Sequence, residues 1–169
     1  MKNRTIYLLI GAKGSGKSFI GKLMDRLFKI KFVRVEDWAI KVKSKRALSD
    51  DKYLKEVFEI IEKGVRKELL QVDQIVFEST GLTHYFDEML VNLKYDFQLV
   101  TIKILTNDRL CLKRVKTRDR SIHINVSDEE VEQINQMVLE KNMKCDFEIK
   151  NNKKSEKQLI EELKIIINR

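Results

Sequence analysis

Proline is absent from the 169-residue sequence, and glycine is scarce, with six residues in all. Domain linkers are often rich in these two residue types, so their scarcity predicts one domain spanning residues 1–169. Hydrophobic residues make up 43% of the chain, which is too large a fraction for a disordered protein. A single domain of this length can bury a full core.

Cysteine is scarce too, and no long apolar run is present. Cys111 and Cys145 lie outside any C-x-x-C motif and lack metal-ligand spacing to a histidine, so we expect neither a disulfide nor a zinc site. No apolar run approaches the length that spans a bilayer, and the first predicted strand begins at residue 5, which leaves no room for a signal peptide. We therefore expect a cytoplasmic protein with no membrane partner. Nothing in the sequence indicates its oligomeric state.

Acidic residues are outnumbered by basic ones, 26 against 34, which gives a net charge of +8. Residues 29–46 and residues 103–120 each hold seven basic and two acidic residues, so each segment carries a net charge of +5. Basic segments of this kind suit either nucleic acid or phosphorylated small molecules. The charge count does not choose between these partners.

One stretch of eight residues, the phosphate-binding loop, fits the pattern G-x-x-x-x-G-K-[ST] at every position. It consists of Gly11, Ala12, Lys13, Gly14, Ser15, Gly16, Lys17 and Ser18. The aliphatic run before the loop predicts a buried strand, and apolar residues at helical spacing after it predict a helix. In such a loop the backbone N–H groups surround phosphate oxygens, the lysine reaches the β- and γ-phosphates, and the serine hydroxyl ligates Mg²⁺. We therefore expect this loop and the adjoining Phe19 to bind ATP, with Mg²⁺ on Ser18.

Predicted strands and helices alternate along the chain. The strands are expected at residues 5–10, 31–35, 74–77, 98–105 and 147–149. The helices are expected at about residues 19–27, 39–43, 49–71, 83–94, 108–117, 128–138 and 156–166. This alternation predicts a three-layer α/β/α sandwich with a parallel five-stranded sheet. Ligands of such sheets bind at the C-terminal ends of the strands.

Carboxylates follow two of the predicted strands. Glu36 and Asp37 lie at the expected end of the second strand, where a carboxylate could orient or deprotonate a substrate hydroxyl. The alternative for Asp37 is to cap the helix that follows, and the two roles are compatible. Glu78 closes the third strand, and its role stays open between a magnesium ligand, a catalytic base, a substrate contact and a solvated strand end.

A basic segment follows the fourth strand. Arg114 and Arg118 are four residues apart and are expected on one helix face, with Arg120 beyond the helix end. A guanidinium group can hold phosphate oxygens and stabilise the transferring phosphoryl group, so we expect Arg114 to contact the nucleotide and Arg118 and Arg120 to be catalytic. The alternative for all three is a solvated helix face, which we prefer for the neighbouring Arg109, Lys113 and Lys116.

Three further residues have less specific signals. His84 and His123 lack a nucleophile at a matching position, and His123 is interpreted as a surface residue, with substrate contact as the alternative. Trp38 is expected to pack in the core rather than to stack on a base or ring.

Together these motifs resemble those of P-loop kinases, the group that includes nucleoside monophosphate, shikimate, gluconate and polynucleotide kinases. The resemblance implies the strand order 2-3-1-4-5, a substrate acid just after strand two, an arginine-bearing lid after strand four, and an asparagine near the adenine after strand five. Asp37, the segment at about 114–127 and Asn151 occupy those three places, which is why we favour Asp37 over Glu36. A helical segment at about 38–71 would cover the substrate or form a longer crossover.

The sequence therefore predicts an ATP- and Mg²⁺-dependent kinase that moves the γ-phosphate to a hydroxyl or phosphate of a small molecule or nucleotide. The expected catalytic residues are Lys17, Asp37, Glu78, Arg118 and Arg120, and the expected metal ligands are Ser18 and Glu78. One alternative is a 5′-hydroxyl polynucleotide kinase or a nucleic-acid-binding protein, which the basic segments support. The other is a P-loop nucleotide hydrolase or switch protein, although no aspartate-glycine motif follows strand three and no N-K-x-D motif is present.

Overall fold

The computed structural model describes residues 3–43, 50–119, 121, 123–124 and 126–169. Its strands form one parallel sheet in the order β2-β3-β1-β4-β5, the order implied by the resemblance. The strands are β1 (Thr5–Ile10), β2 (Lys31–Phe32), β3 (Gln74–Ser79), β4 (Gln98–Leu105) and β5 (Phe147–Lys150).

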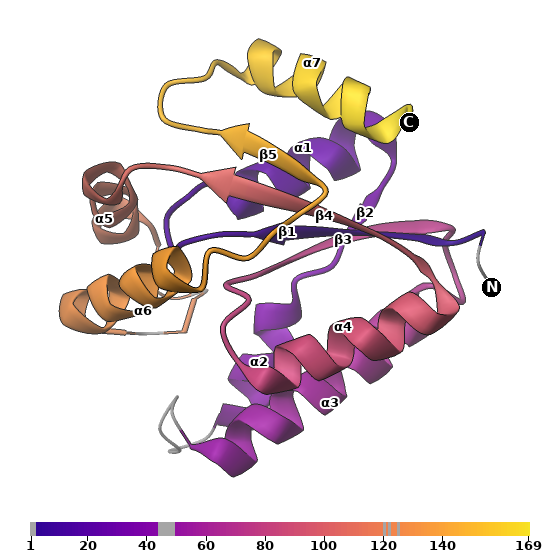
Figure 1. Ribbon diagram of the computed structural model, residues 1–169, viewed down its shortest axis with the longest axis horizontal. Helices are drawn as coiled ribbons and strands as arrows, with labels where there is room; N and C mark the ends of the chain where they lie inside the picture. The colour runs from indigo at the N-terminus through magenta and orange to yellow at the C-terminus, as the bar shows by residue number, and fades with distance from the viewer. Residues whose placement is uncertain (1–2, 44–49, 120, 122, 125) are drawn as a thin grey trace.

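Helices cover both faces of the sheet (Figure 1). On one face lie α1 (Lys17–Phe28) and α7 (Glu156–Ile167). On the other face lie α2 (Val35–Lys43), α3 (Asp51–Glu68) and α4 (His84–Asp96). The expected α/β/α layers are thus confirmed. Two more helices, α5 (Asp108–Thr117) and α6 (Asp128–Lys141), lie beyond the edge where the strands end. None of the described helices has both the length and the apolar character needed to cross a membrane.

The buried side chains of β1 alternate between two hydrophobic clusters, as the pleat of a strand requires. Ile6, Leu8 and Ile10 belong to the cluster that includes residues of α2, α3 and α4. Tyr7 and Leu9 belong to the cluster that includes residues of α1 and α7. Because all six residues of β1 are buried, this strand holds the two outer layers together.

The C-terminal ends of the three central strands lie side by side. Ile10, the last residue of β1, pairs with Ser79 of β3 and with Lys103 of β4. The phosphate-binding loop leaves β1 at this edge and leads directly into α1. Side chains that follow β1, β3 and β4 are therefore brought to one place.

The predicted second strand is too long. The strand was expected at residues 31–35, but in the structure β2 ends at Phe32 and α2 already begins at Val35. The backbone N–H of Val33 still donates to the Val76 carbonyl oxygen at 2.8 Å. Glu36 and Asp37 lie in the first turn of this helix, where acidic side chains are favoured by the positive end of the helix dipole. The expected position of these two carboxylates at a strand end is therefore wrong.

Candidate active site

The backbone of the phosphate-binding loop requires glycine at two positions. Gly14 has φ of 83° and Gly16 has φ of 99°, in the left-handed region that other residues rarely adopt. A Cβ atom at Gly14 would lie 2.3 Å from the carbonyl oxygen of Cys111, and one at Gly16 would lie 2.3 Å from Nδ2 of Asn151. Both the backbone angle and the close packing exclude a side chain at these positions.

The carbonyl oxygen of Ser15 is held from outside the loop by three donors. Asn151 Nδ2 and Thr106 Oγ1 each donate to it at 2.9 Å, and a terminal guanidinium nitrogen of Arg114 donates at 3.3 Å. The same guanidinium also donates to the carbonyl oxygens of Gly14 and Asn151. Arg114 and Asn151, both expected at the nucleotide, therefore support the loop backbone itself.

A second support comes from α6 and was not found from the sequence. The Lys13 backbone N–H donates to Oδ1 of Asn135 at 2.7 Å, and Nδ2 of Asn135 donates to the Lys13 carbonyl oxygen at 3.1 Å. Asn135 is only 3% exposed. One buried amide thus satisfies both backbone groups of a loop residue, which fixes the loop against α6.

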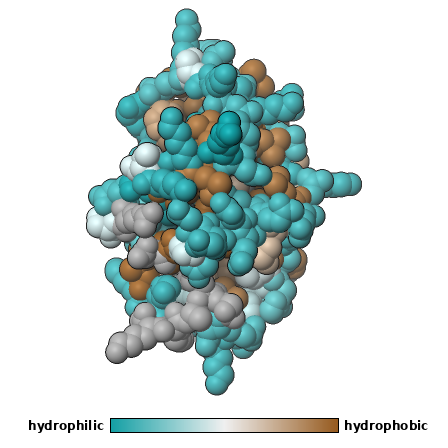
Figure 2. Space-filling view, turned by 90° about the vertical axis from the view of Figure 1, so that its left-hand side faces the viewer, coloured by the Kyte–Doolittle hydropathy of each residue, from teal (hydrophilic) through white to brown (hydrophobic). Residues whose placement is uncertain are grey.

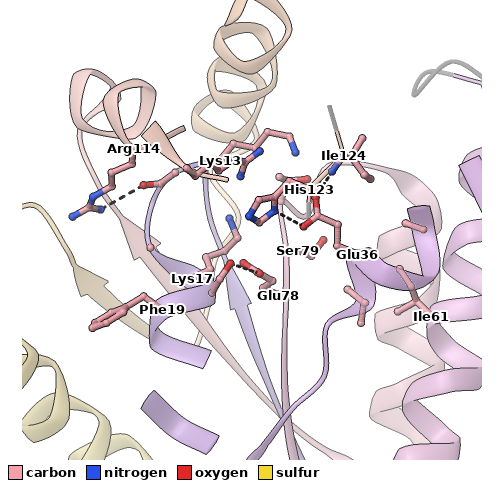
Figure 3. Close-up of a pocket in the computed structure, with 17 residues that line it drawn as sticks. Lys13, Lys17, Phe19, Glu36, Ile61, Glu78, Ser79, Arg114, His123 and Ile124 are labelled. Atoms are coloured by element: carbon pink, nitrogen blue, oxygen red, sulfur yellow. Dashed lines mark hydrogen bonds and ion pairs between the residues drawn. The ribbon is translucent and has the colours of Figure 1, made fainter. Parts of the chain in front are cut away.

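A cavity of about 370 Å³ opens beside the loop. Figure 2 views the molecule from the side where α5 and α6 lie, and hydrophobic side chains are visible there among hydrophilic ones. Many of the residues expected to be functional line the cavity (Figure 3). They are Lys13, Gly14, Gly16, Lys17, Ser18, Phe19, Glu78, Arg114 and Arg118.

Lys17 lies at the first turn of α1 and is 7% exposed. Its Nζ donates to the carbonyl oxygens of Gly11 and Ala12, both at 2.8 Å. Burial lowers the pKa of the Lys17 ammonium, the negative charge of Glu78 opposes this shift, and the positive charge of Lys13 adds to it. An anion bound in the loop would restore the charge balance of this buried cation.

Ser18 and Glu78 form a pair of oxygen groups next to Lys17. The Ser18 hydroxyl donates to Oε1 of Glu78 at 2.5 Å, because β3 runs beside β1 and places Glu78 opposite Leu9. Mg²⁺ is usually held by one or two protein oxygens together with substrate phosphates and water. Among the described residues, no group of three or more His, Cys, Asp or Glu side chains could hold a metal ion by itself. The oxygen pair of Ser18 and Glu78 instead fits Mg²⁺ that is bound together with a nucleotide.

Of the two carboxylates in α2, only Glu36 lines the cavity. Its Oε1 accepts a hydrogen bond from the Ile124 backbone N–H at 2.9 Å, and its Oε2 lies 2.8 Å from Nδ1 of His123. Burial raises the pKa of Glu36, but these two hydrogen bonds, together with the nearby positive charge of Lys13 and the charge interaction with His123, outweigh burial and hold the pKa below its usual value. The Glu36 carboxylate is therefore ionised.

Asp37 points elsewhere. Its side chain is 47% exposed and forms an ion pair with Arg34 at 3.2 Å. Successive residues of a helix point about 100° apart, so Glu36 and Asp37 cannot both face the cavity. The preference for Asp37 over Glu36 rested on both lying at a strand end, and the helical first turn reverses it.

The segment after α5 supplies further cavity residues. Arg118 follows the last residue of α5, so the prediction that it shares a helix face with Arg114 is wrong. Both side chains nevertheless line the cavity. The Nε of Arg118 is buried and has no hydrogen-bond partner among the described residues, as expected for a group that meets an anion. Arg120 lies outside the described residues. His123, interpreted from the sequence as a surface residue, lines the cavity with a side chain only 16% exposed.

Comparison with known proteins identifies the fold. No family model matches the chain, and no curated protein matches its sequence. Solved structures match over nearly the whole chain. Shikimate kinase from Aquifex aeolicus matches with a TM-score of 0.64 and 21% identity, and the matched region covers 97% of this protein and 96% of the shikimate kinase. The APS kinase CysC of Mycobacterium tuberculosis, in complex with AMPPNP and APS, has a TM-score of 0.67 and 12% identity, with full coverage of both chains.

A third match comes from RNA repair. A chain of the Pnkp1/Rnl/Hen1 RNA repair complex matches with a TM-score of 0.65 and 18% identity. The matched region covers 92% of this protein and 51% of the chain from the repair complex. Together with the strand order, these similarities show that the chain has the P-loop kinase fold.

Proposed function

We propose that the protein is an ATP-dependent kinase that transfers the γ-phosphate of ATP to a hydroxyl group of a small molecule or nucleotide. One observation carries the proposal: a single cavity joins the phosphate-binding loop to the Glu36–His123 pair. A phosphoryl donor and an acceptor can therefore meet in one space. The structural similarity to shikimate kinase and APS kinase supports the same reaction type.

The nucleotide half of the cavity is built by the loop and α1. Lys17 lies with its ammonium at the loop, where it would hold the β- and γ-phosphates. Ser18 and Glu78 would hold Mg²⁺, which would supply positive charge to offset the charge that develops during transfer. Arg118, whose Nε is buried and has no hydrogen-bond partner among the described residues, would direct its guanidinium to the transferring group. We also retain Arg120 as a catalytic candidate from the same segment.

The acceptor half is bounded by α2, α3 and the segment after α5. Its apolar wall consists of Val35, Ala39, Ile61 and Ile124. Its polar groups are Glu36, His123 and the neighbouring Ser79 and Thr80. We assign the acceptor-side carboxylate to Glu36, which faces this space.

A polynucleotide acceptor is the second candidate. The similarity to a chain of an RNA repair complex favours it, as does a depression on α5 lined by Arg109, Lys113 and Lys116. Binding to nucleic acid through such residues weakens steeply as salt is added. Oligonucleotide binding that is absent, or insensitive to salt, would exclude this candidate.

The test is ATP consumption by the purified protein with Mg²⁺, alone and with separate acceptor pools. The pools hold nucleosides and nucleotides, hydroxylated acids and sugars, and 5′-hydroxyl oligonucleotides. We expect consumption that depends on one pool. Equal consumption without any acceptor would indicate a nucleotide hydrolase instead.

Lys17→Ala is the matched control for that assay. The substitution removes the ammonium from the loop, so we expect phosphate transfer to fall to background while thermal unfolding still shows a folded protein. Lys164→Ala, which changes an exposed lysine of α7 away from the loop, should retain transfer. Turnover by Lys17→Ala at the wild-type rate would contradict the kinase proposal.

A further inference from the structure

Glu36 and His123 form a carboxylate–imidazole pair although they are 87 positions apart in the sequence. The Nδ1 atom of His123 lies 2.8 Å from Oε2 of Glu36. The adjoining Ile124 backbone N–H donates to the other carboxylate oxygen at 2.9 Å. Two consecutive residues of one segment thus hold both oxygens of Glu36, which fixes the imidazole relative to α2.

The hydrogen-bond partners decide which ring nitrogen carries the proton. An ionised carboxylate can only accept hydrogen bonds, so the Nδ1 atom of His123 must be the donor to Glu36. In the neutral ring the other nitrogen, Nε2, then keeps its lone pair. The pair therefore presents a basic nitrogen rather than an N–H group on the side away from Glu36.

That side of the ring belongs to the cavity. His123 lines the cavity together with Lys17 and Arg118, and Figure 3 shows its ring between the Glu36 carboxylate and the loop that carries Lys17. Charged groups approach from several elements: Glu36 from α2, Lys13 and Lys17 from the loop and α1, Glu78 from β3, and Arg118 and Asp119 after α5.

We propose that His123 is the general base of the phosphoryl transfer, oriented by Glu36. The acceptor's hydroxyl oxygen forms a bond to the γ-phosphorus as the bond from that phosphorus to the β,γ-bridging oxygen breaks. The bridging oxygen leaves with ADP. The hydroxyl proton passes to Nε2 of His123, and the carboxylate of Glu36 offsets the positive charge of the resulting imidazolium. This assignment rests on the proposed kinase function.

The pair suits the task better than Glu36 alone. Both oxygens of Glu36 already accept hydrogen bonds, and these bonds lower its pKa and so its basicity. Histidine is the side chain that most often acts as a general base in proton transfer, and the second ring nitrogen of His123 is not used in the contact with Glu36. Glu36 then acts as a positioning residue.

The first test reads the tautomer and needs no substrate. The chain has two histidines, and the exposed His84 at the start of α4 serves as an internal reference in ¹⁵N–¹H imidazole spectra. We expect neutral His123 to carry its proton on Nδ1. Glu36→Ala should change the His123 signals and leave those of His84 unchanged. A proton on Nε2 in the wild type, or a His123 spectrum that Glu36→Ala does not alter, would overturn the proposal.

The second test uses the acceptor found in the consumption assay. Loss of a general base costs about 10²- to 10⁴-fold in rate, so we expect His123→Ala to lower kcat by that factor with little change in the KM for ATP. Added imidazole should restore part of the rate, which it would not do for a purely structural role. His84→Ala should behave as the wild type.

The outcomes separate this inference from the proposed function. If the wild type transfers phosphate and His123→Ala matches its kcat, or if imidazole does not rescue a folded His123→Ala that binds ATP normally, the base assignment is wrong and the kinase assignment stands. If no acceptor supports turnover by the wild type, the proposed function fails, and the base assignment fails with it.

Discussion

The charge of Glu36 is tied to two hydrogen bonds from the segment that follows α5. Its side chain is 23% exposed, and the N–H donors of His123 and Ile124 stabilise the carboxylate form. The chain therefore gains stability from an ionised Glu36. The size of this stabilisation depends on the contact between residues 123–124 and α2.

The stabilisation by Glu36 should depend on pH. Because the pKa of Glu36 in the folded protein lies below its usual value of about 4.5, its contribution is present above that value and is lost as the pH falls through the folded pKa. We expect Glu36→Gln to lower the free energy of unfolding by about 1–3 kcal/mol near pH 7. The difference from the wild type should shrink as the solution is made more acidic than the usual glutamate pKa.

Urea unfolding at a series of pH values measures this effect. Asp37→Asn is the matched control, since the neighbouring carboxylate is half exposed and pairs only with Arg34 among the bonds described for it. That variant should change stability little. If the difference in the free energy of unfolding between Glu36→Gln and the wild type is constant from neutral to acidic pH, the charge of Glu36 contributes nothing to stability.

At the scale of elements, α6 is linked to the phosphate-binding loop through Asn135. Its amide makes both a donated and an accepted hydrogen bond with the backbone of Lys13. Removal of one partner leaves buried backbone groups unsatisfied, which costs about 1–3 kcal/mol. We expect Asn135→Ala to lower the free energy of unfolding by this amount and to weaken ATP binding, because the loop loses its support.

Denaturant unfolding and calorimetric ATP titration together measure both effects. Gln133→Ala removes an exposed amide from the same helix and should leave stability and ATP affinity near those of the wild type. If Asn135→Ala is destabilised but binds ATP with unchanged affinity, the hydrogen bonds between Asn135 and Lys13 stabilise the fold without affecting nucleotide binding.

Helices α2 and α3 meet where Trp38 packs on Gly64. A Cβ atom at Gly64 would lie 2.4 Å from the Trp38 ring. Alanine is favoured over glycine in a helix by about 1 kcal/mol, yet here the added methyl group would push the ring away. We expect Gly64→Ala to destabilise the protein and to shift the fluorescence of Trp38, the only tryptophan. Lys63→Ala, at an exposed position of α3, should do neither.

Sequence patterns predicted most elements because their signals are local. The start of α6 is an example: Ser127 and Glu130 fit the capping-box pattern, and both hydrogen bonds of that pattern are present in the structure. The end of β2 was harder to predict, because Val33 and Val35 are β-branched and favour a strand, whereas in the structure α2 already begins at Val35. The link between Asn135 and Lys13 spans 122 positions, and no local pattern marks it.

At the scale of the whole molecule, alternation of strands and helices was sufficient to predict the layered parallel sheet. The phosphate-binding loop was also predictable, since its function depends on eight consecutive residues. The acceptor half was not, because it is assembled from α2, α3 and a segment without periodicity. His123 therefore carried no signal in the sequence beyond its presence in the expected lid.

Nucleotide binding should stabilise the whole fold. A ligand present at 100 times its Kd adds about 2.7 kcal/mol to the free energy of unfolding, which for a chain of this size raises Tm by roughly 5–11 °C. We expect this shift with ATP and Mg²⁺ together and a much smaller one for Lys17→Ala. An equal shift for both proteins in thermal unfolding would place the nucleotide outside the loop.

In the proposed reaction, one cavity brings ATP and an acceptor hydroxyl together for phosphoryl transfer. The most direct measurement is ³¹P NMR of a reaction mixture of protein, ATP, Mg²⁺ and the acceptor pool that supports ATP consumption. We expect a new phosphate ester resonance that grows in equal amount with ADP. Growth of inorganic phosphate with ADP, and no ester, would contradict this expectation and show that water is the acceptor.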